Sequence, residues 1–318
     1  MCKIKEIVFI LSLLLLVGHC IKNPVDDGNY FPTPAYPSPY SDPSWSADGK
    51  TIFFYRMKVT HITGAGNFSY DPDSTGIWAI NADGTNMRLL LQGKGHSPEL
   101  SPDGDWLVYE EGGQIYKARY VDGLIDTSDI VQLTTEGRNF FPAWSPDGQW
   151  IAYDSNVDNP SGGYSVRIMR FDGNNGRILV SGRMADWSPR GRDIIFIGFH
   201  NEIYRVDVND TSKVERLTSL NRDNIYTTDN RYPQYSPDGN KIMFISKGIC
   251  VMGADGTNLI QITNDAVTSK ASWSPDGRIV YVRFISTRLN VNNGTLWIMN
   301  ADGSNKWQLT YNHGLILE

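Results

Sequence analysis

Short apolar runs alternate with Gly-, Pro- and Asp-rich turns along most of the chain, and the same unit recurs six times. In each unit an aromatic or leucine residue precedes a Ser-Pro-Asp-Gly-type turn, and a second apolar run follows it. The turn glycines are 55, 44, 43, 48 and 38 residues apart, a spacing that suits four-stranded propeller blades. The six turns are Ser46–Gly49, Ser101–Gly104, Ser145–Gly148, Ser188–Gly191, Ser236–Gly239 and Ser274–Gly277.

Each unit contains two more apolar segments. The third strand is predicted at positions such as Ile77–Ile80 and Leu296–Met299, and in five units an Asp-Gly turn follows it. The fourth unit has Asp207-Val208-Asn209-Asp210 in place of Asp-Gly. A closing Leu-Thr-like pair, for example Leu309-Thr310, marks the fourth strand. The unit is therefore predicted to be four antiparallel strands.

Four short strands cannot bury both faces of their sheet alone, so neighbouring units must stack. Closing the stack into a ring leaves only short, protected edges, whereas a solenoid or an incomplete array would expose an apolar end face. We therefore predict an all-β fold, a six-bladed β-propeller of four-stranded antiparallel blades over residues 43–314, with a C-terminal tail at 315–318.

The recurring xPxWSPDG segment, the second apolar strand with its Asp-Gly turn and the closing Leu-Thr together resemble the propeller repeats of the TolB family. The resemblance covers nearly all of residues 43–312. It implies a six-bladed propeller and a place in the bacterial envelope, where TolB proteins are periplasmic. TolB carries an α/β domain before its propeller, and only Ile21–Asp42 stand there in this sequence. The role of TolB with the Tol machinery is therefore not carried over.

The first twenty residues have the order of an export signal. Lys3 and Lys5 precede the apolar run Ile7–Val17, which at about 1.5 Å per helical residue spans only roughly half of a ~30 Å hydrocarbon core. The run leads to Cys20, and this ending resembles a bacterial lipoprotein signal. We therefore expect a signal peptide at 1–19 and a lipid attached to Cys20.

A residue at the cleavage site departs from that pattern, because His19 stands where a small residue is usual. Plain secretion and an uncleaved anchor remain open as alternatives. Residues 20–42 contain five prolines after the cysteine, which favours extended backbone and predicts a semi-rigid tether. We expect a periplasmic or outer-membrane-associated location in the cell envelope.

Composition and charge limit the classes of partner that the chain can bind. Of the 318 residues, 40% are hydrophobic and 20% are charged, and the net charge is −6, so the chain has the material for a core. No run of basic residues is present, which argues against a nucleic-acid partner. Cys250 is the one cysteine left after Cys2 and Cys20 are assigned, and it stands at a strand position, so we expect a core residue rather than a redox thiol.

Catalytic motifs are not found. The histidines are isolated from one another, no G-x-S-x-G segment occurs, and no hydrolase domain follows the repeats. The segment Asp71–Gly76 begins like a calcium loop, but Thr75 is a poor third ligand and Ala82 stands where a bidentate glutamate belongs. We predict no enzyme activity, no cofactor and no metal.

Two carboxylates are placed near the propeller axis. Glu99 and Asp186 each precede the aromatic or leucine residue of an innermost strand. A carboxylate in that position needs a partner or water. Hydrogen bonds to backbone groups would explain both residues, and a ligand- or cation-binding channel is the alternative.

One face should carry the irregular loops, because alternating strands place the Ser-Pro-Asp-Gly and Asp-Gly turns on the other face. Loops on a rigid scaffold tolerate variation and often bind partners, and Tyr and Arg are enriched among interface residues. The candidate partner-binding residues are His61, Phe68, Tyr70, Arg222, Tyr226, Arg231 and Arg288.

The sequence thus predicts a non-enzymatic binding or scaffold lipoprotein, monomeric, which recognises a protein or peptide partner through its loop face. The alternative is a binder of small molecules or glycans, or a hydrolase or lyase, acting at the central channel.

Overall fold

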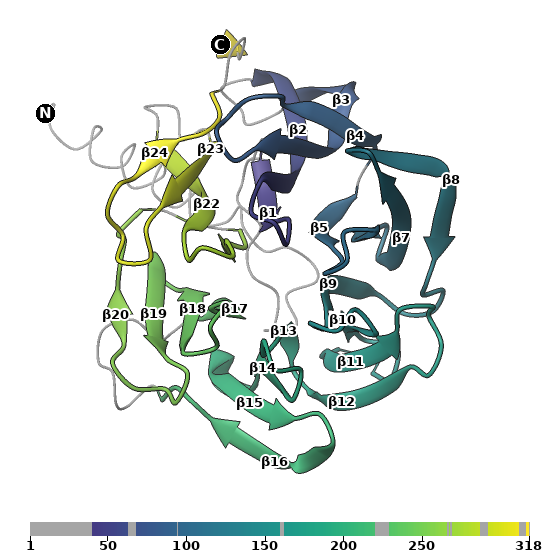
Figure 1. Ribbon diagram of the computed structural model, residues 1–318, viewed down its shortest axis with the longest axis vertical. Coiled ribbons are helices and arrows are strands. Elements are labelled where there is room, and N and C mark those ends of the chain that lie inside the picture. Colours follow the sequence, from purple (N-terminus) through teal and green to yellow (C-terminus); the bar gives the residue numbers. More distant parts are fainter. Residues whose placement is uncertain are drawn as a thin grey trace, which may run out of the picture. The chain divides into compact units, whose positions relative to one another are not determined.

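The computed structural model describes residues 40–62, 68–93, 95–159, 162–219, 229–265, 267, 269–286, 292–311 and 316–317. All of them belong to one compact unit, residues 34–318. Within this unit six antiparallel sheets succeed one another around a ring, and the first strand of each blade lies nearest the centre (Figure 1). The prediction of a six-bladed β-propeller with four-stranded blades is confirmed.

Each blade uses four consecutive strands, paired in chain order from the innermost to the outermost. Blade one contains β1 (Tyr40–Trp45), β2 (Thr51–Ile62), β3 (Phe68–Asn81) and β4 (Arg88–Gln92). Blade two contains β5 (His96–Leu100), β6 (Trp106–Glu111), β7 (Gln114–Val121) and β8 (Leu124–Gln132). Blade three contains β9 (Asn139–Trp144), β10 (Trp150–Ser155), β11 (Ser165–Arg170) and β12 (Arg177–Ser181).

Blade four contains β13 (Arg183–Trp187), β14 (Asp193–Ile197), β15 (Ile203–Asp207) and β16 (Asp210–Arg216). Blade five contains β17 (Arg231–Tyr235), β18 (Lys241–Ile245), β19 (Ile249–Gly253) and β20 (Ile260–Gln261). Blade six contains β21 (Ser272–Trp273), β22 (Ile279–Ser286), β23 (Asn292–Met299) and β24 (Trp307–Gln308).

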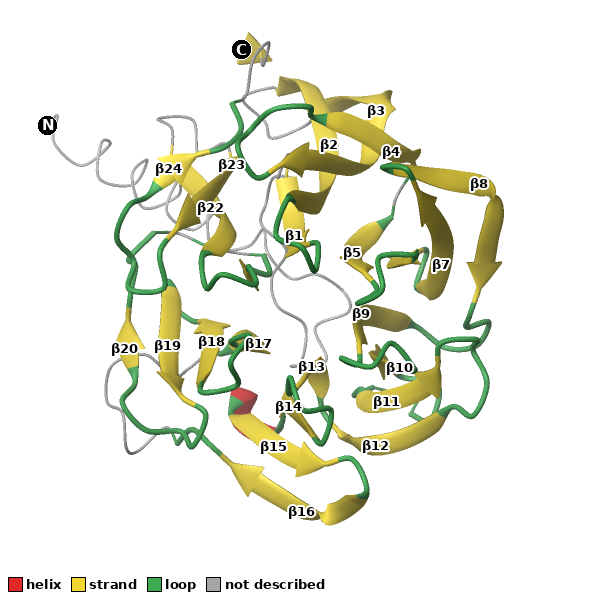
Figure 2. Cartoon of the chain, viewed as in Figure 1, coloured by secondary structure: helices red, strands yellow, loops and turns green. Residues whose placement is uncertain are grey.

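The described residues are almost entirely strands and loops, with one short 3-10 turn, η1 (Phe199–Asn201), in blade four (Figure 2). None of the described segments forms a helix that is long and apolar enough to cross a membrane.

The Ser-Pro-Asp-Gly turn has a common hydrogen-bond pattern. In blade five the Ser236 hydroxyl donates to Asp238 at 2.6 Å and accepts the Lys241 N–H at 2.9 Å. The turn glycines of the six blades have φ between 67° and 84°, a left-handed conformation that costs a glycine little. The recurring Asp residues of these turns therefore have structural roles.

In blades two, four and six the closing threonine accepts a hydrogen bond from the third strand and so joins it to the outer part of the blade. In blade six the Leu296 N–H donates to Thr310 Oγ1 at 2.9 Å, and Ile203 N–H donates to Thr218 in blade four at the same distance. Both threonines are buried. A buried backbone N–H that loses its partner is costly, which explains why the Leu-Thr pair recurs.

The core lies between adjacent blades, and the ring is closed in the same way. One buried cluster combines Trp45 and Phe54 of blade one with Val280 and Leu296 of blade six. The Trp45 indole N–H donates to the Ser272 carbonyl at 3.2 Å. The four strands of every blade are consecutive in the chain. The ring is therefore closed by side-chain packing between the first and last blades.

Two segments differ from the sequence prediction. Lys58–Gly76, which contains His61, Phe68 and Tyr70 from the predicted irregular loops, is largely a hairpin extension of β2 and β3. The predicted tail contains a short strand, β25 (Ile316–Leu317), which pairs in parallel with His61 and Ile62 of β2. The first blade also begins at Tyr40, earlier than the predicted boundary.

Candidate functional site: the central channel and the loop face

Five innermost strands contain the same irregularity at one position. Their pairing with the second strand shifts register there, which defines a β-bulge. The bulged residues are not glycines, yet their φ angles lie between 49° and 54°. Non-glycine residues adopt this conformation at a cost, and such strain concentrates at functional sites. These residues are Asp42, Ser97, Phe141, Met184 and Tyr232.

The bulged residues narrow the channel. The rings of Phe141, in blade three, and Tyr232, in blade five, are 5.4 Å apart and meet edge to face. Met184 from blade four lines the same small cavity, whose volume of about 20 Å³ leaves room for roughly one water molecule. Ser97, Asp186 and Lys270 line the same cavity, so apolar and polar side chains meet at this level of the channel.

The charged groups at this level of the channel contact one another and the backbone. The Lys270 ammonium is 3.0 Å from Glu99 Oε2, and Glu99 Oε1 accepts the Trp144 N–H at 2.9 Å. Asp186 accepts the Tyr235 N–H at 2.9 Å. Burial would lower the pKa of Lys270, but the two carboxylates outweigh it and raise that pKa.

Burial and the charge of Glu99 raise the pKa of Asp186 to about 7, against the Tyr235 N–H and Lys270, which lower it. The structure thus brings Glu99 and Asp186 into one electrostatic cluster. Lys270 was not among the residues predicted from the sequence. It lies four residues before Ser274, the same offset as Tyr232 from Ser236, and this repeat position could have identified it.

The position of Glu99 and Asp186 also joins neighbouring blades. In blade five its equivalent, Gln234, accepts the Trp273 N–H of blade six at 2.9 Å. In blade one Ser44 donates to the Pro98 carbonyl of blade two at 2.6 Å. Glu99 and Asp186 therefore make the hydrogen bonds to backbone groups that would explain both carboxylates.

Ionisable side chains of blades one and two lie at the channel mouth on the loop side. His96 stacks against Tyr55 with ring centroids 4.0 Å apart, and its Nδ1 is 4.0 Å from Asp42 Oδ2. Burial lowers the pKa of His96, and Asp42 and Glu111 oppose that shift. This side of the mouth therefore presents a neutral imidazole among carboxylates near pH 7.

Blades three to five supply the opposite side of the mouth. The Met184 N–H donates to both carboxylate oxygens of Asp154, at 2.8 and 2.9 Å. Burial raises the pKa of Asp154 to about 8, although this N–H and Arg183 lower it. Arg183 also donates to Asn201 Oδ1 of η1 at 2.9 Å.

The structure describes only part of the predicted partner-binding set. Arg231 pairs with Asp229 near the mouth, and Tyr70 is exposed on β3. His61 and Phe68 lie in paired strands, with side chains outside the described set. Arg222, Tyr226, Arg288 and the predicted lipid site Cys20 also lie outside the described residues.

An exposed aromatic residue on the loop face was missed. Phe199 is 75% exposed in the connection between β14 and β15, and its ring centroid is 3.9 Å from that of His200. His200 and Asn201 both have left-handed φ angles. No local pattern indicates this turn, because its exposure follows from the tertiary fold.

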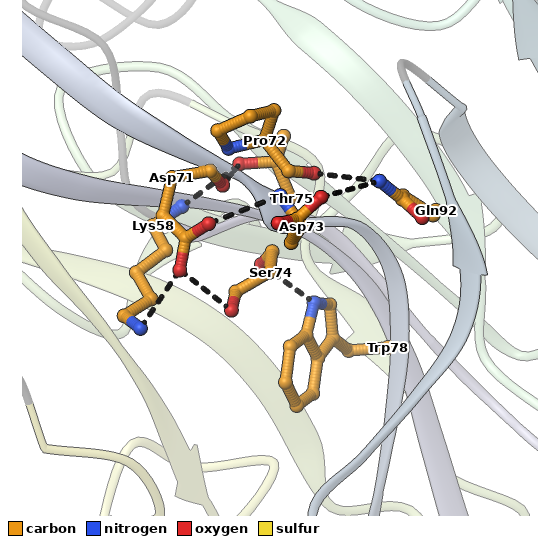
Figure 3. Close-up of polar contacts among 8 residues, drawn as sticks. All are labelled: Lys58, Asp71, Pro72, Asp73, Ser74, Thr75, Trp78 and Gln92. Carbon is orange, nitrogen blue, oxygen red and sulfur yellow. Dashed lines mark hydrogen bonds and ion pairs between the residues drawn. The ribbon is translucent and has the colours of Figure 1, made fainter.

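The segment that begins like a calcium loop is occupied by its own side chains (Figure 3). Asp71 Oδ2 accepts bonds from the Lys58 ammonium at 3.0 Å and from the Ser74 hydroxyl at 2.9 Å. Thr75 donates its hydroxyl to the Asp71 carbonyl. A lysine thus neutralises the carboxylate that a cation would need.

Other candidate chemistry is limited. Within the described ranges no three His, Cys, Asp or Glu side chains are grouped so that they could hold a metal ion. Cys250 is fully buried, and burial raises the pKa of its thiol to about 12. It is therefore a core residue.

The ring of six four-stranded blades defines a β-propeller, a fold that suits a binding or scaffold role. The chain belongs to the TolB β-propeller domain family, whose model, described as the TolB beta propeller domain, matches residues 151–317. A search of curated proteins finds no match.

Solved structures share the fold. The putative TolB from Agrobacterium tumefaciens is 24% identical, with a TM-score of 0.59 over 71% of this chain and 84% of that one. TolB from Acinetobacter baumannii is 20% identical, with a TM-score of 0.62 over 81% of this chain, which spans 63% of that protein. An oligogalacturonate lyase in complex with manganese is 13% identical, with a TM-score of 0.55 over 85% of this chain and 77% of that one. At these identities the likeness concerns the fold alone.

Proposed function

We propose that this protein is a non-enzymatic binding lipoprotein of the bacterial envelope, which holds a protein or peptide partner on its loop face at the channel mouth. The observation that carries the proposal is the pair of exposed aromatic side chains on the loop face of a rigid ring, Phe199 in the β14–β15 connection and Tyr70 on β3. Loops on a rigid scaffold often bind partners, and aromatic residues are enriched among the residues that dominate interfaces.

The contacts of the charged residues in the channel favour a binding function over a catalytic one. Glu99 and Asp186 already accept backbone N–H groups, and Lys270 neutralises Glu99. A hydrolase or lyase acting at the channel centre would need these groups free and a path for its substrate.

Residues at the loop-side rim add contact chemistry. Phe199 supplies an exposed aromatic ring, and Tyr70 and Arg231 are the predicted partner-binding residues whose side chains are described. His61, Phe68, Arg222, Tyr226 and Arg288 remain proposed contacts.

The envelope location rests on the sequence. The Lys3 and Lys5 signal, the apolar run and Cys20 support export and lipid attachment, and similarity to TolB proteins is consistent with it. We propose that residues 20–42 tether a monomeric propeller to the membrane, with 43–314 as the binding domain.

Site-specific photocrosslinking in intact cells tests the proposal. A photoreactive residue at Phe199 should trap a discrete partner, whereas the same residue at Ile260, exposed on β20 and near the turn face, should trap none. Equal yields at the two positions, or no product from Phe199 in folded protein, would contradict a loop-face partner.

A further inference from the structure

A groove follows the boundary between blades four and five on the face of the Ser-Pro-Asp-Gly turns. It extends from the innermost turn of blade four, at Arg190, to its outermost strand, at Lys213, and Asp238 and Asn240 of blade five form the other wall. Its volume is about 610 Å³, within the range of small-ligand sites. It lies on the face opposite the proposed partner site.

The groove coincides with a departure from the repeat. Five units have Asp at the third turn position, and only the fourth unit has arginine, Arg190. In blade five the equivalent Asp238 accepts bonds from Ser236 and Asn240. Arg190 has no such role, and its exposed side chain makes no hydrogen bond or ion pair with any described residue.

A second departure shapes the outer wall. The fourth unit lacks the Asp-Gly turn, and β15 continues almost directly into β16. From β15, Arg205 reaches across to the Ala254 carbonyl of blade five at 3.3 Å and pairs with Glu215 of β16. The base of the groove is thus held together by bonds between the two blades.

The charges that line the groove are paired except at its inner end. Arg192 pairs with Asp207 at 3.2 Å, and Arg205 pairs with Glu215. The Arg190 guanidinium and the Asp193 carboxylate have no side-chain partner among the described residues. The groove therefore contains one cation and one carboxylate without a side-chain partner among the described residues.

We propose that this groove binds an anionic saccharide. A planar guanidinium binds a carboxylate in bidentate fashion, which assigns the acidic group of the sugar to Arg190. Asp193 and Asn240 can accept hydrogen bonds from sugar hydroxyls. A ligand that carried only negative charge would be repelled by Asp193 and Asp238, so hydroxyl groups are needed beside the anionic group.

Isothermal titration calorimetry with the full chain tests the inference. The probe is a tetrasaccharide that contains glucuronic acid, compared with its carboxyl-reduced form and with inorganic phosphate. Wild-type protein should bind the acidic tetrasaccharide. The carboxyl-reduced form loses the charged hydrogen bonds to Arg190, and phosphate lacks the sugar hydroxyls, so each should bind at least about tenfold more weakly.

Two charge-matched variants separate the groove from general surface charge. R190D restores the turn of the other five repeats, so it should fold normally and weaken the tetrasaccharide at least about tenfold. K50D makes the same change in charge beside the equivalent turn of blade one, where Lys50 is 81% exposed, and should leave binding unchanged. Absence of binding by wild type, equal loss in the two variants, or phosphate bound as tightly as the tetrasaccharide would each overturn the proposal. None of these results bears on the loop-face partner.

Discussion

At the scale of single residues, the same repeat position has different consequences in different blades. The residue before the aromatic or leucine residue of the innermost strand accepts a backbone N–H of the next blade, whether it is Glu99, Asp186 or Gln234. A glutamine does this without charge. A carboxylate brings charge into the channel, and its cost depends on the neighbouring groups.

Asp186→Asn should make stability less dependent on pH. The folded-state pKa of Asp186 is raised from 3.8 to about 7, so the folded protein binds more protons than the unfolded chain between these values. The free energy of unfolding therefore falls as pH rises through this window, by about 2 kcal/mol between pH 5 and pH 8 from this group.

The asparagine amide oxygen keeps the bond from Tyr235 and carries no charge. Urea unfolding at pH 5 and pH 8 should show the variant close to wild type at pH 5 and more stable at pH 8. An identical pH dependence in both proteins would mean that Asp186 is ionised throughout.

At the scale of the element, the turn sequence is a small hydrogen-bonded unit whose strength varies among blades. Ser236 both donates to Asp238 and accepts from Lys241. Ser188, in the turn with Arg190, accepts only the Asp193 N–H, at 3.1 Å. Loss of the hydroxyl should therefore matter more in blade five than in blade four.

Ser236→Ala should lower the free energy of unfolding by about 2 kcal/mol and Ser188→Ala by about 1 kcal/mol, since each hydrogen bond contributes about 1 kcal/mol net. Urea denaturation of the two variants measures the difference. If both substitutions cost the same, the aspartate of the turn adds nothing to the serine.

At the scale of the whole molecule, ring closure depends on packing between the first and last blades. Trp45 is buried among residues of both, and the Arg278 guanidinium lies 5.2 Å from its ring centroid. The C-terminal β25 contributes only two residue pairs with β2. The blade interface should therefore dominate the stability of the closed ring.

Trp45→Ala should destabilise the protein by about 3–5 kcal/mol, as expected for a buried tryptophan. Removal of residues 312–318 should cost less than about 1 kcal/mol, because it leaves that interface intact. Thermal unfolding followed by near-ultraviolet circular dichroism compares the two. A larger loss from the truncation would show that the terminal strand holds the ring closed.

The sequence by itself determined the number of blades, their strand order and the turn chemistry. These features depend on local hydrogen bonds and on a pattern of apolar strands and turns that recurs in all six repeats. The sequence also placed Glu99 and Asp186 near the axis. Only the tertiary structure decided that Lys270 pairs with Glu99, that the rings of Phe141 and Tyr232 meet and that Arg190 borders a groove. These contacts join residues of different blades, which are distant in sequence, and their geometry depends on the closed ring.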